Sequence, residues 1–311
     1  MIVYITIFIS SVILTLFMKK INIIDNPNHR SSHEKPIPTA GGISFVLPFY
    51  ALLLYLYNSH EIDRGLFFAL FSSLPLFIVS FLDDIFDLNI YIRLGVQIVS
   101  TILAFYFLGI FSHFSLWLVA LFFISMIWLI NLYNFLDGID GYAGSEAIFV
   151  SIGAYFIYHD RLFIFLAIGV FAFLIFNWQR ASIFMGDSGS IFLGYIFGVF
   201  ALYHYDSFDD ILVWIMLLGI FVFDGTLTLL RRFKNGEVIS KPHKKHYFQR
   251  LVQSGYSHQK TTLLALLFNI VVYIFLYLSY GSNLLYILFI IYIFAIFILS
   301  KWVDKKRGFD V

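Results

Sequence analysis

The chain contains no cysteine and carries little charge for its length. Of its 311 residues, 13% are charged and 60% are hydrophobic, and the mean hydropathy is +0.87. The absence of cysteine excludes disulfides, thiolate metal sites and a cysteine nucleophile. A soluble globular domain is nearer half apolar and about a quarter charged. The composition therefore predicts a polytopic integral membrane protein, and the net charge of +1 gives no indication of a nucleic-acid partner.

The first apolar run also lacks the features of a cleaved leader. No basic region precedes residues 2–18, no small-residue cleavage site follows them, and Lys19 and Lys20 come after the run. We therefore expect an uncleaved first membrane span rather than a signal peptide.

Long apolar runs recur along the whole chain. A transmembrane helix needs about 20 apolar residues, so the pattern predicts an all-α fold, a polytopic bundle of about eleven transmembrane helices that forms a single domain over residues 1–311. Leu, Ile and Phe in these runs indicate lipid contact or helix packing and nothing more specific. The expected spans are 2–18, 42–58, 65–82, 93–111, 115–134, 142–158, 162–178, 188–204, 211–230, 262–280 and 283–302.

Basic residues fall almost wholly on one side of these spans. Arg64 and Arg161 are the only Lys or Arg residues in the sequence that lie on the other side. The positive-inside rule makes the basic side cytoplasmic, with the N-terminus outside and the C-terminus inside. The polar loops are therefore expected at the cytoplasmic face of the membrane. The expected cytoplasmic loops are 19–41, 83–92, 135–141, 179–187 and 231–261, together with the C-terminal tail.

Two adjacent carboxylates, Asp83 and Asp84, follow an apolar run directly. Adjacent carboxylates repel unless a cation or a proton lies between them, so the pair indicates a divalent metal or a cationic substrate group. The plainer alternative is a solvated helix end.

Residues 131–141 place amides, carboxylates and glycines where an apolar helix ends. Asn134 and Asp137 are three residues apart and share a helix face if the helix continues that far. Their oxygen atoms suit Mg²⁺, which prefers oxygen ligands and keeps waters and substrate phosphates. Asn131 is explained as well by hydrogen bonding between helices, and we interpret it as structural. Asp140 fits that explanation poorly.

A second acidic turn, residues 185–190, precedes the span that starts near residue 188. Asp187 or Ser188 could cap that helix. A further carboxylate on the cytoplasmic side also favours a metal ligand at Asp187.

The longest polar segment, 231–261, is rich in cations and contains His243 and His246. Zinc is conceivable, but the neighbouring cations favour a phosphate-rich anion. Attraction to anionic lipid would explain the basic residues without explaining the histidines. Asp224, inside the ninth expected span, is either a buried hydrogen-bonded acid or a support for the site.

The loop 25–42 contains three prolines and ends in the pair Gly41–Gly42. Ordinary loop chemistry explains much of it, although Lys35 and the glycines would also suit a phosphate cradle.

In this order and on one side, the motifs resemble those of the polyprenyl-phosphate N-acetylhexosamine-1-phosphate transferases, the family 4 type of glycosyltransferase. The resemblance runs over most of the chain, from about residue 25 to 250. It implies transfer of a sugar-1-phosphate from a UDP-N-acetylhexosamine to undecaprenyl phosphate, with UMP as the second product. It also implies a Mg²⁺ or Mn²⁺ cofactor. A homodimer is a further expectation.

By this resemblance, Asp187 and Asn134 hold the metal, and Asp83 and Asp84 act at the lipid phosphate as the catalytic pair. A base is not required on chemical grounds, because a phosphate monoester is already mostly ionised near pH 7. The residues that the resemblance assigns to substrate binding are Lys35, Arg93, Asp137, Asp140, His243 and His246.

Two details resemble the branch of the family that starts O-antigen chains rather than the peptidoglycan branch. They are the Arg30-Ser31-Ser32-His33 string and the pattern from His243 to Arg250. A peptidoglycan-branch enzyme remains an alternative. So does an ion-coupled transporter or lipid flippase with Asp83, Asp137 and Asp224 as a relay, although transporters normally place ionisable residues near the membrane midplane.

Overall fold

The computed structural model describes residues 1–21, 23–27, 35–239, 241 and 243–309. Its regular elements are helices and two short antiparallel strands, joined by turns and loops. The expected Arg30–His33 string lies outside the described residues. The strands are β1 (Ile24–Asp25) and β2 (Ile37–Pro38). The helices are α1 (Ile2–Met18), α2 (Ile43–Asn58), α3 (Arg64–Phe71), α4 (Leu74–Phe86), α5 (Ile90–Phe107), α6 (Ile110–His113), α7 (Leu116–Leu136), α8 (Tyr142–Tyr158), α9 (Arg161–Asn177), α10 (Asp187–Tyr203), α11 (Phe208–Leu217), α12 (Gly219–Lys234), α13 (Tyr247–Gln253), α14 (His258–Ser279) and α15 (Leu284–Lys306).

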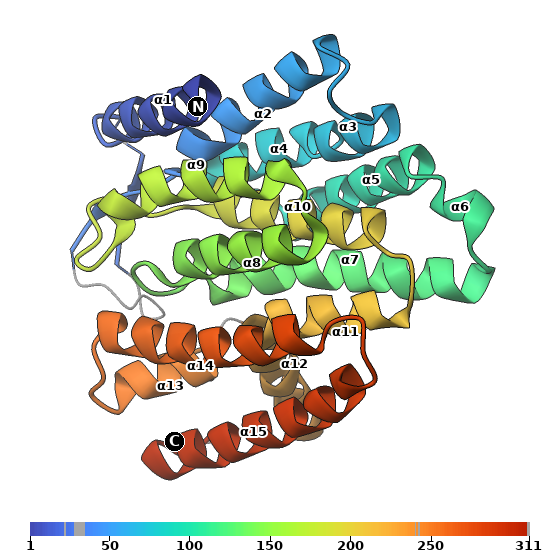
Figure 1. Cartoon of the computed structure of the whole chain (residues 1–311). Coiled ribbons are helices and arrows are strands. Elements are labelled where there is room, and N and C mark those ends of the chain that lie inside the picture. Colours follow the sequence, from blue (N-terminus) through green and yellow to red (C-terminus); the bar gives the residue numbers. More distant parts are fainter. Residues whose placement is uncertain (22, 28–34, 240, 242, 310–311) are drawn as a thin grey trace.

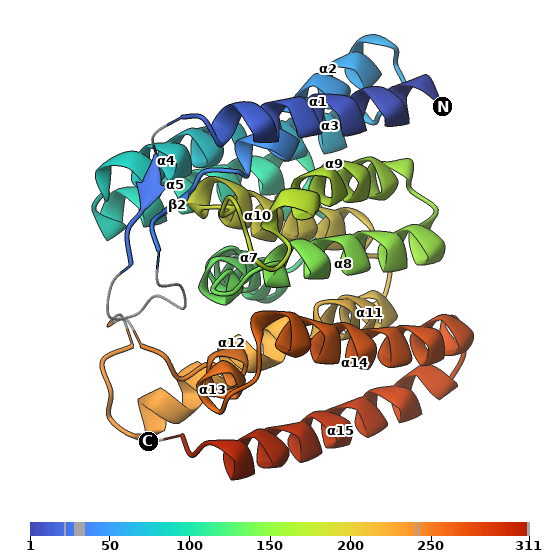
Figure 2. The same ribbon diagram turned by 90° about the vertical axis from the view of Figure 1, so that its left-hand side faces the viewer.

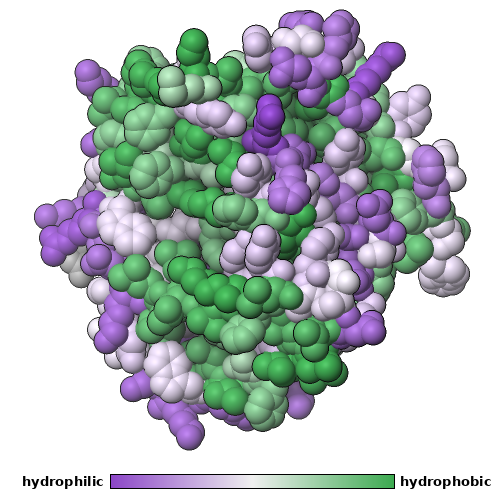
Figure 3. Space-filling model, in the orientation of Figure 1, coloured by the Kyte–Doolittle hydropathy of each residue, from purple (hydrophilic) through white to green (hydrophobic). Residues whose placement is uncertain are grey.

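Most helices lie side by side with roughly parallel axes, so the bundle has two ends (Figures 1 and 2). The end on the left of Figure 1 holds β1 and β2, the connection from α9 to α10, helix α13 and the C-terminal end of α15. Hydrophobic side chains cover α14 and α15 between the two ends, and polar side chains gather at the left edge (Figure 3). This distribution is that of a polytopic membrane protein.

Helix α10 is the centre of the bundle. Residues 188–200 are all buried, and the helix packs on α2, α4 and α7. Two glycines permit the close approach to α7, since a Cβ atom on Gly194 would lie 2.8 Å from the Cα of Ile130, and one on Gly198 would lie 2.2 Å from the sulfur of Met126. Small residues at helix contacts are the usual solution in membranes, where van der Waals packing drives helix association.

All of the expected apolar segments are helical. Fewer than eleven of them, however, form helices of 18 or more residues that are apolar enough to cross a membrane. Within the described residues, five helices or continuous helix pairs are long and apolar enough to span, and the bent pair α11–α12 would make a sixth. Several of the other segments, such as α1 and α10, have only 17 residues. The chain is therefore polytopic, while the count of eleven stays a prediction.

One expected span is not continuous, which corrects the sequence interpretation. Residues 211–230 break at Leu218, where α11 and α12 meet with a bend of 84°. Gly219 follows the break, and a Cβ atom there would lie 2.2 Å from the hydroxyl of Tyr292, so the glycine lets α15 approach the bend closely. Residues 65–82, by contrast, lie in one continuous helical stretch, Arg64–Phe86, and at the junction of α3 and α4 the hydroxyls of Ser72 and Ser73 donate hydrogen bonds back to carbonyls of α3.

Candidate active site

The turn between α4 and α5 brings Asp83 against Arg93. Asp87 ends α4 in a left-handed conformation, and the Asn89 side chain caps α5 by accepting from the Tyr91 N–H at 2.9 Å. The Asp83 carboxylate then accepts from the Leu88 N–H at 2.6 Å and from Nη1 of Arg93 at 2.6 Å. Both oxygens of Asp83 are thus engaged, and one of them pairs with a guanidinium, so Asp83 anchors Arg93.

Asp84 has a different partner, the N-terminus of α10. Its Oδ1 accepts from the Asp187 N–H at 2.7 Å and its Oδ2 from the Ser188 N–H at 3.2 Å. These are two of the N–H groups that a helix leaves unpaired at its start, and a carboxylate also stabilises the positive end of the helix dipole. Gly186 adopts φ +75°, and a Cβ atom there would lie 2.7 Å from the Asp84 carboxylate. The glycine therefore makes room for a cap that comes from another helix.

Because Asp84 caps α10, it holds Asp187 at the start of that helix. Side chains from α5 and α7 meet Asp187 there. Asp187 accepts from Nδ2 of Asn134 on α7 at 2.7 Å and from Nη1 of Arg93 on α5 at 3.3 Å. Its carboxyl also lies within hydrogen-bonding distance of the Asp83 carboxyl. Ser190, one turn further along α10, accepts from the same amide of Asn134 at 3.1 Å. We call Asp83, Arg93, Asn134 and Asp187 the acidic cluster.

The acidic cluster has the oxygen chemistry that Mg²⁺ or Mn²⁺ takes. Asp187 and Asp83 supply carboxylates close together, which a cation between them would stabilise. Nδ2 of Asn134 faces Asp187, and a turn of the amide would present its oxygen instead. Among the described residues no group of three or more His, Cys, Asp or Glu side chains has metal-binding geometry. The cluster thus offers two carboxylates and one amide to a cation, and the metal stays a prediction.

Asp137 lies beside the cluster, at the C-terminal end of α7. Burial, reinforced by the negative charge of Asp187, raises the pKa of Asp137 to about 7. Asp137 thus adds a carboxyl that is only partly ionised near neutral pH at the edge of the cluster.

Asn131 does not join the cluster, which confirms its structural interpretation. Its Nδ2 donates to Oε1 of Gln97 on α5 at 2.7 Å and to the Ile127 carbonyl at 2.8 Å, while Nε2 of Gln97 donates back at 3.3 Å. The hydrogen bonds between the side-chain amides of Gln97 and Asn131 link α5 to α7 next to the acidic cluster.

The carboxylate of Asp140 contacts the loop before α10 and the start of α14. Its Oδ2 accepts from the Ala181 N–H at 3.2 Å, and His258 of α14 lies 3.4 Å from its Oδ1. Asn177 joins the same two loops, since it accepts from the Gly141 N–H at 3.1 Å and donates to the Ile183 carbonyl at 2.9 Å. Asp140 thus ties loop 135–141 to loop 179–187 and α14, and its expected role at the nucleotide stays a prediction.

The glycine pair at the start of α2 packs against the start of α10 and the residues before it, and its expected role in a phosphate cradle stays a prediction. Gly41 and Gly42 donate to the carbonyls of Phe184 and Met185 at 2.9 and 2.8 Å. A Cβ atom on Gly42 would lie 2.3 Å from the Cα of Gly189. Lys35 is exposed just before β2, and no contact within the described residues joins it to the acidic cluster.

Asp224 caps the short helix α13 as Asp84 caps α10. Its Oδ1 accepts from the Tyr247 N–H at 2.9 Å and its Oδ2 from the Phe248 N–H at 3.1 Å. Nδ1 of His246 also lies 2.9 Å from Oδ1, and the hydroxyl of Thr228 donates to that oxygen at 3.1 Å. Asp224 is therefore a buried, hydrogen-bonded acid, which was one of the two expectations, and its role in supporting the site stays a prediction.

His243 packs on His246, with ring centroids 4.8 Å apart. Burial, the neighbouring His246 and the Arg232 charge lower the pKa of His243 to about 3. His243 is thus neutral at pH 7, and its Nδ1 accepts from the Lys245 N–H at 3.2 Å.

Sequence reasoning missed three of the polar residues that hold these parts together. Gln97 and Asn177 are single polar residues inside or at the end of apolar runs, and that isolation was the available signal, whereas Ser190 belongs to the acidic turn 185–190 but was given no role of its own. An isolated polar residue in a membrane helix normally needs a partner on another helix.

Comparison with known proteins agrees with this geometry. Residues 66–205, which include Asp83, Arg93, Asn134 and Asp187, match the model of glycosyl transferase family 4. The chain is 30% identical to a probable undecaprenyl-phosphate N-acetylglucosaminyl 1-phosphate transferase of Bacillus subtilis, over 94% of this chain and 87% of that protein. It is 29% identical to the undecaprenyl-phosphate alpha-N-acetylglucosaminyl 1-phosphate transferase of Thermotoga maritima, over 91% of this chain and 94% of that protein.

A phospho-N-acetylmuramoyl-pentapeptide-transferase of Thermotoga neapolitana is 33% identical, but over only 54% of this chain and 60% of that protein. The two N-acetylglucosaminyl 1-phosphate transferases thus match more than 90% of this chain, and the pentapeptide transferase about half. With its cluster of acids at one end of a helical membrane bundle, the chain belongs to glycosyl transferase family 4.

Proposed function

We propose that the chain transfers N-acetylhexosamine-1-phosphate, with N-acetylglucosamine as the favoured sugar, from a UDP-sugar to undecaprenyl phosphate. An oxygen of the lipid phosphate attacks the phosphorus that carries the sugar. The bond between that phosphorus and the bridging oxygen breaks, and UMP leaves with the oxygen. The product is a lipid diphosphate-sugar, the first membrane intermediate of a cell-surface polysaccharide.

The observation that carries this proposal is the convergence of Asp83, Arg93, Asn134 and Asp187 at one end of the bundle. Phosphoryl transfer requires mainly positioning and charge neutralisation. The contacts between Asp187 and Arg93 and between Asp187 and Asn134 supply a preformed set of charges for that purpose.

Each side chain then has a role that its contacts support. Mg²⁺ or Mn²⁺ bound by Asp187 and Asn134 would neutralise charge on the donor pyrophosphate. Arg93, held by Asp83, binds the phosphate of the acceptor. Asp84 acts as a positioning residue, because it holds the N-terminus on which Asp187 sits. The catalytic role first expected of Asp83 and Asp84 stays a prediction.

The remaining expected residues line the donor side. Asp137 and Asp140 shape the nucleotide side. Lys35, His243 and His246 close over the phosphates and the sugar. The capped segment from His246 onward is fixed by Asp224, so its histidine is presented in one orientation.

The proposed site lies at the cytoplasmic face of the bacterial inner membrane. The chain crosses that membrane eleven times and forms homodimers. The distribution of basic residues supports that face, and a bilayer-soluble acceptor needs a site at the membrane surface.

A donor panel tests the reaction. Purified protein in lipid nanodiscs is incubated with undecaprenyl phosphate, Mg²⁺ and UDP-N-acetylglucosamine, another UDP-N-acetylhexosamine or UDP-N-acetylmuramoyl-pentapeptide, and UMP is measured. We expect UMP with UDP-N-acetylglucosamine and its loss when the metal is chelated. UMP from the pentapeptide donor alone would move the chain to the peptidoglycan reaction, and no UMP from any donor would refute the proposal.

A further inference from the structure

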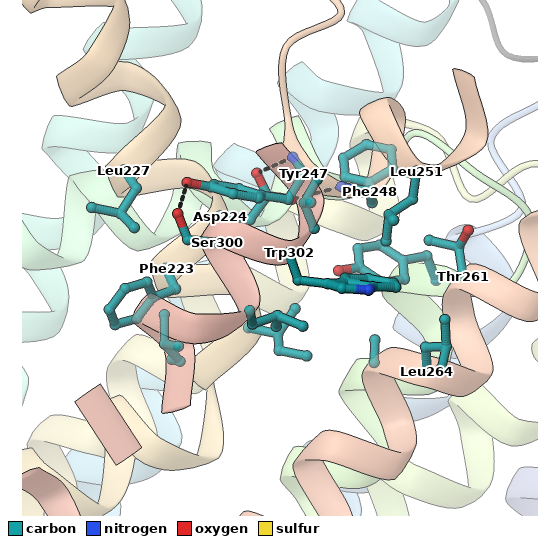
Figure 4. A pocket seen from close by; sticks show the side chains of 16 residues that line it. Phe223, Asp224, Leu227, Tyr247, Phe248, Leu251, Thr261, Leu264, Ser300 and Trp302 are labelled. Atoms are coloured by element: carbon teal, nitrogen blue, oxygen red, sulfur yellow. Dashed lines mark hydrogen bonds between the residues drawn. The ribbon is translucent and has the colours of Figure 1, made fainter. Parts of the chain in front are cut away.

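Residues 243–250, which we call the histidine segment, lead into a helix that is too short to be stable by itself. Helix α13 has seven residues, and an isolated helix of fewer than about 12 residues is unstable in water. One side of α13 borders a cavity of about 270 Å³, to which Tyr247, Phe248 and Leu251 contribute (Figure 4). Contacts with other elements must therefore hold α13 in place.

The C-terminal end of α15 supplies such contacts (Figures 1 and 2). Asp304, in the last turn of α15, accepts from Nη2 of Arg250 on α13 at 2.7 Å. The same Nη2 donates to the carbonyl of Arg307, which follows α15. The Arg250 side chain is 1% exposed, and a buried guanidinium that loses an acceptor destabilises the fold. The pair thus joins α13 to the end of α15.

The carboxylate of Asp304 also joins both helices to α12. Nη1 and Nη2 of Arg231 on α12 donate to its two oxygens at 2.8 and 3.0 Å, in a bidentate pair. Ser300, one turn earlier on α15, accepts from Nη2 of Arg231 at 3.0 Å. Its hydroxyl lies 2.9 Å from that of Tyr247, as Figure 4 shows. Asp304 and Ser300 therefore hold α12, α13 and α15 together.

An aromatic ring from the same end of the chain contacts the residue before His246. Nζ of Lys245 lies 5.0 Å from the centre of the Phe309 ring, and the guanidinium carbon of Arg250 lies 5.6 Å from it. Cations at these distances are attracted to the face of a ring. Lys245 also pairs with Glu237 at 2.7 Å, so the ring adds to an existing contact. The end of α15 and the residues after it thus contact the histidine segment on both sides of His246.

We propose that Asp304 is a positioning residue of the proposed active site. Through Arg250 and Arg231 it holds the histidine segment against α12 and α15, and so it keeps His246 in one orientation. The effect on the reaction rests on the proposed function, in which His246 closes over the phosphates and the sugar of the donor. The attachment of the histidine segment is independent of that function.

The expected kinetic signature separates this role from a general loss of stability. Without the carboxylate of Asp304, the histidine segment gains freedom, and His246 must be ordered again each time a donor binds. Ordering of that kind weakens binding, while the acidic cluster still carries out the transfer. We therefore expect a higher KM for the UDP-sugar with a smaller change in kcat. A variant that only unfolds more readily would lower the apparent kcat at an unchanged KM.

Amide exchange tests the attachment without any substrate. Hydrogen–deuterium exchange over residues 246–252 is compared in nanodiscs for the wild type, Asp304→Asn and Phe309→Ala. We expect exchange to accelerate about tenfold in Asp304→Asn, and less in Phe309→Ala, where a ring contact alone is lost. Asp209→Asn is the matched control and should leave this exchange unchanged. Asp209 accepts from the Tyr286 hydroxyl at 2.6 Å, near the start of α15 and far from α13.

A UMP assay tests the role in the reaction. We expect Asp304→Asn to raise the KM for UDP-N-acetylglucosamine roughly fivefold. The double variant of Asp304→Asn and His246→Ala should have the KM of His246→Ala alone, because Asp304 acts through His246.

The two measurements fail in different ways. Unchanged exchange in Asp304→Asn, or equal acceleration in Asp209→Asn, would overturn the attachment. A wild-type KM in Asp304→Asn would overturn the role in the reaction, and so would KM effects of Asp304→Asn and His246→Ala that add fully in the double variant. No UMP from the wild type would instead refute the proposed function, and amide exchange would still show whether Asp304 holds the histidine segment.

Discussion

At the residue scale, neighbouring carboxylates have different tasks because their partners differ. Asp83 faces Arg93, while Asp84 faces the backbone N–H groups of Asp187 and Ser188. The sequence indicated an acidic pair but gave no way to separate the two, since the partner of Asp84 is 103 residues away along the chain.

Replacement of Asp84 tests its capping role. Asp84→Ala removes both acceptors from the start of α10, so we expect a loss of about 1 kcal/mol in stability, typical for a helix cap. We also expect UMP release to fall, because Asp187 loses its support. Thermal unfolding in detergent and a UMP assay measure the two effects.

Asp87→Asn is the control for that variant, because asparagine tolerates the left-handed conformation of residue 87. Asp87 is four residues from Asp83 and lies in the same turn, but its side chain does not cap α10. Equal effects of the two substitutions on unfolding and on turnover would contradict the capping role.

The neutral state of His243 predicts a pH dependence of stability. The pKa of His243 is about 3 in the folded chain, against about 6.5 for an unfolded histidine. Between these values the unfolded chain binds more protons, so the free energy of unfolding falls as pH drops through this window. We expect His243→Gln to weaken the fall in melting temperature between pH 7 and pH 5. An unchanged slope in the variant would show that His243 is not held neutral.

At the element scale, the fold twice uses an acid from one helix to start another. Asp84 of α4 caps α10, and Asp224 of α12 caps α13. The apolar pattern was sufficient to predict the helices, because spans are set by length and hydropathy. It was insufficient to predict α13 or the break at Leu218, since both depend on contacts between distant segments, such as that of Gly219 with Tyr292.

Exchange of backbone amides tests the cap on α13. In Asp224→Asn the side chain keeps one acceptor oxygen, so only one of the Tyr247 and Phe248 N–H groups can stay paired. We expect faster hydrogen–deuterium exchange over residues 246–250 and a lower kcat with an intact protein fold.

Thr228→Val is the matched control, since Thr228 donates to Asp224 without contacting the N–H groups of α13. Unaltered exchange in Asp224→Asn would disprove the cap. So would the same acceleration in Thr228→Val.

The contact between α2 and α10 predicts strong sensitivity at Gly42. A Cβ atom in Gly42→Ala would lie 2.3 Å from the Cα of Gly189, and backbone cannot move aside as a side chain can. We expect a clear drop in melting temperature. Gly95→Ala, on α5 with open space around the glycine, should instead gain up to about 1 kcal/mol. Similar melting temperatures for both variants would contradict the packing described.

At the scale of the whole molecule, the distribution of basic residues and the positions of the polar side chains both indicate an active site at one end of the bundle. The loops expected on the cytoplasmic side contribute Asp83, Asp187 and His246, and the structure brings Asp83 and Asp187 together. The family match and the acidic cluster thus support each other. The number of crossings could not be settled from hydropathy, because helices such as α10 are short and buried.

Reporter fusions test the sidedness. We expect a fusion at the C-terminus and one in loop 179–187 to report the cytoplasm, as the positive-inside rule requires. A fusion in the turn between α8 and α9 should report the opposite side. A periplasmic signal from the C-terminal fusion would break the proposed topology.

The central claim is that the acidic cluster at the start of α10 carries out sugar-1-phosphate transfer. The most direct measurement compares UMP release by wild-type protein and Asp187→Asn, in nanodiscs with UDP-N-acetylglucosamine, undecaprenyl phosphate and Mg²⁺. The variant keeps the shape of Asp187 but loses its charge, so we predict a fall in turnover of roughly 1,000-fold, with an unchanged melting temperature. Turnover equal to that of the wild type would contradict the claim.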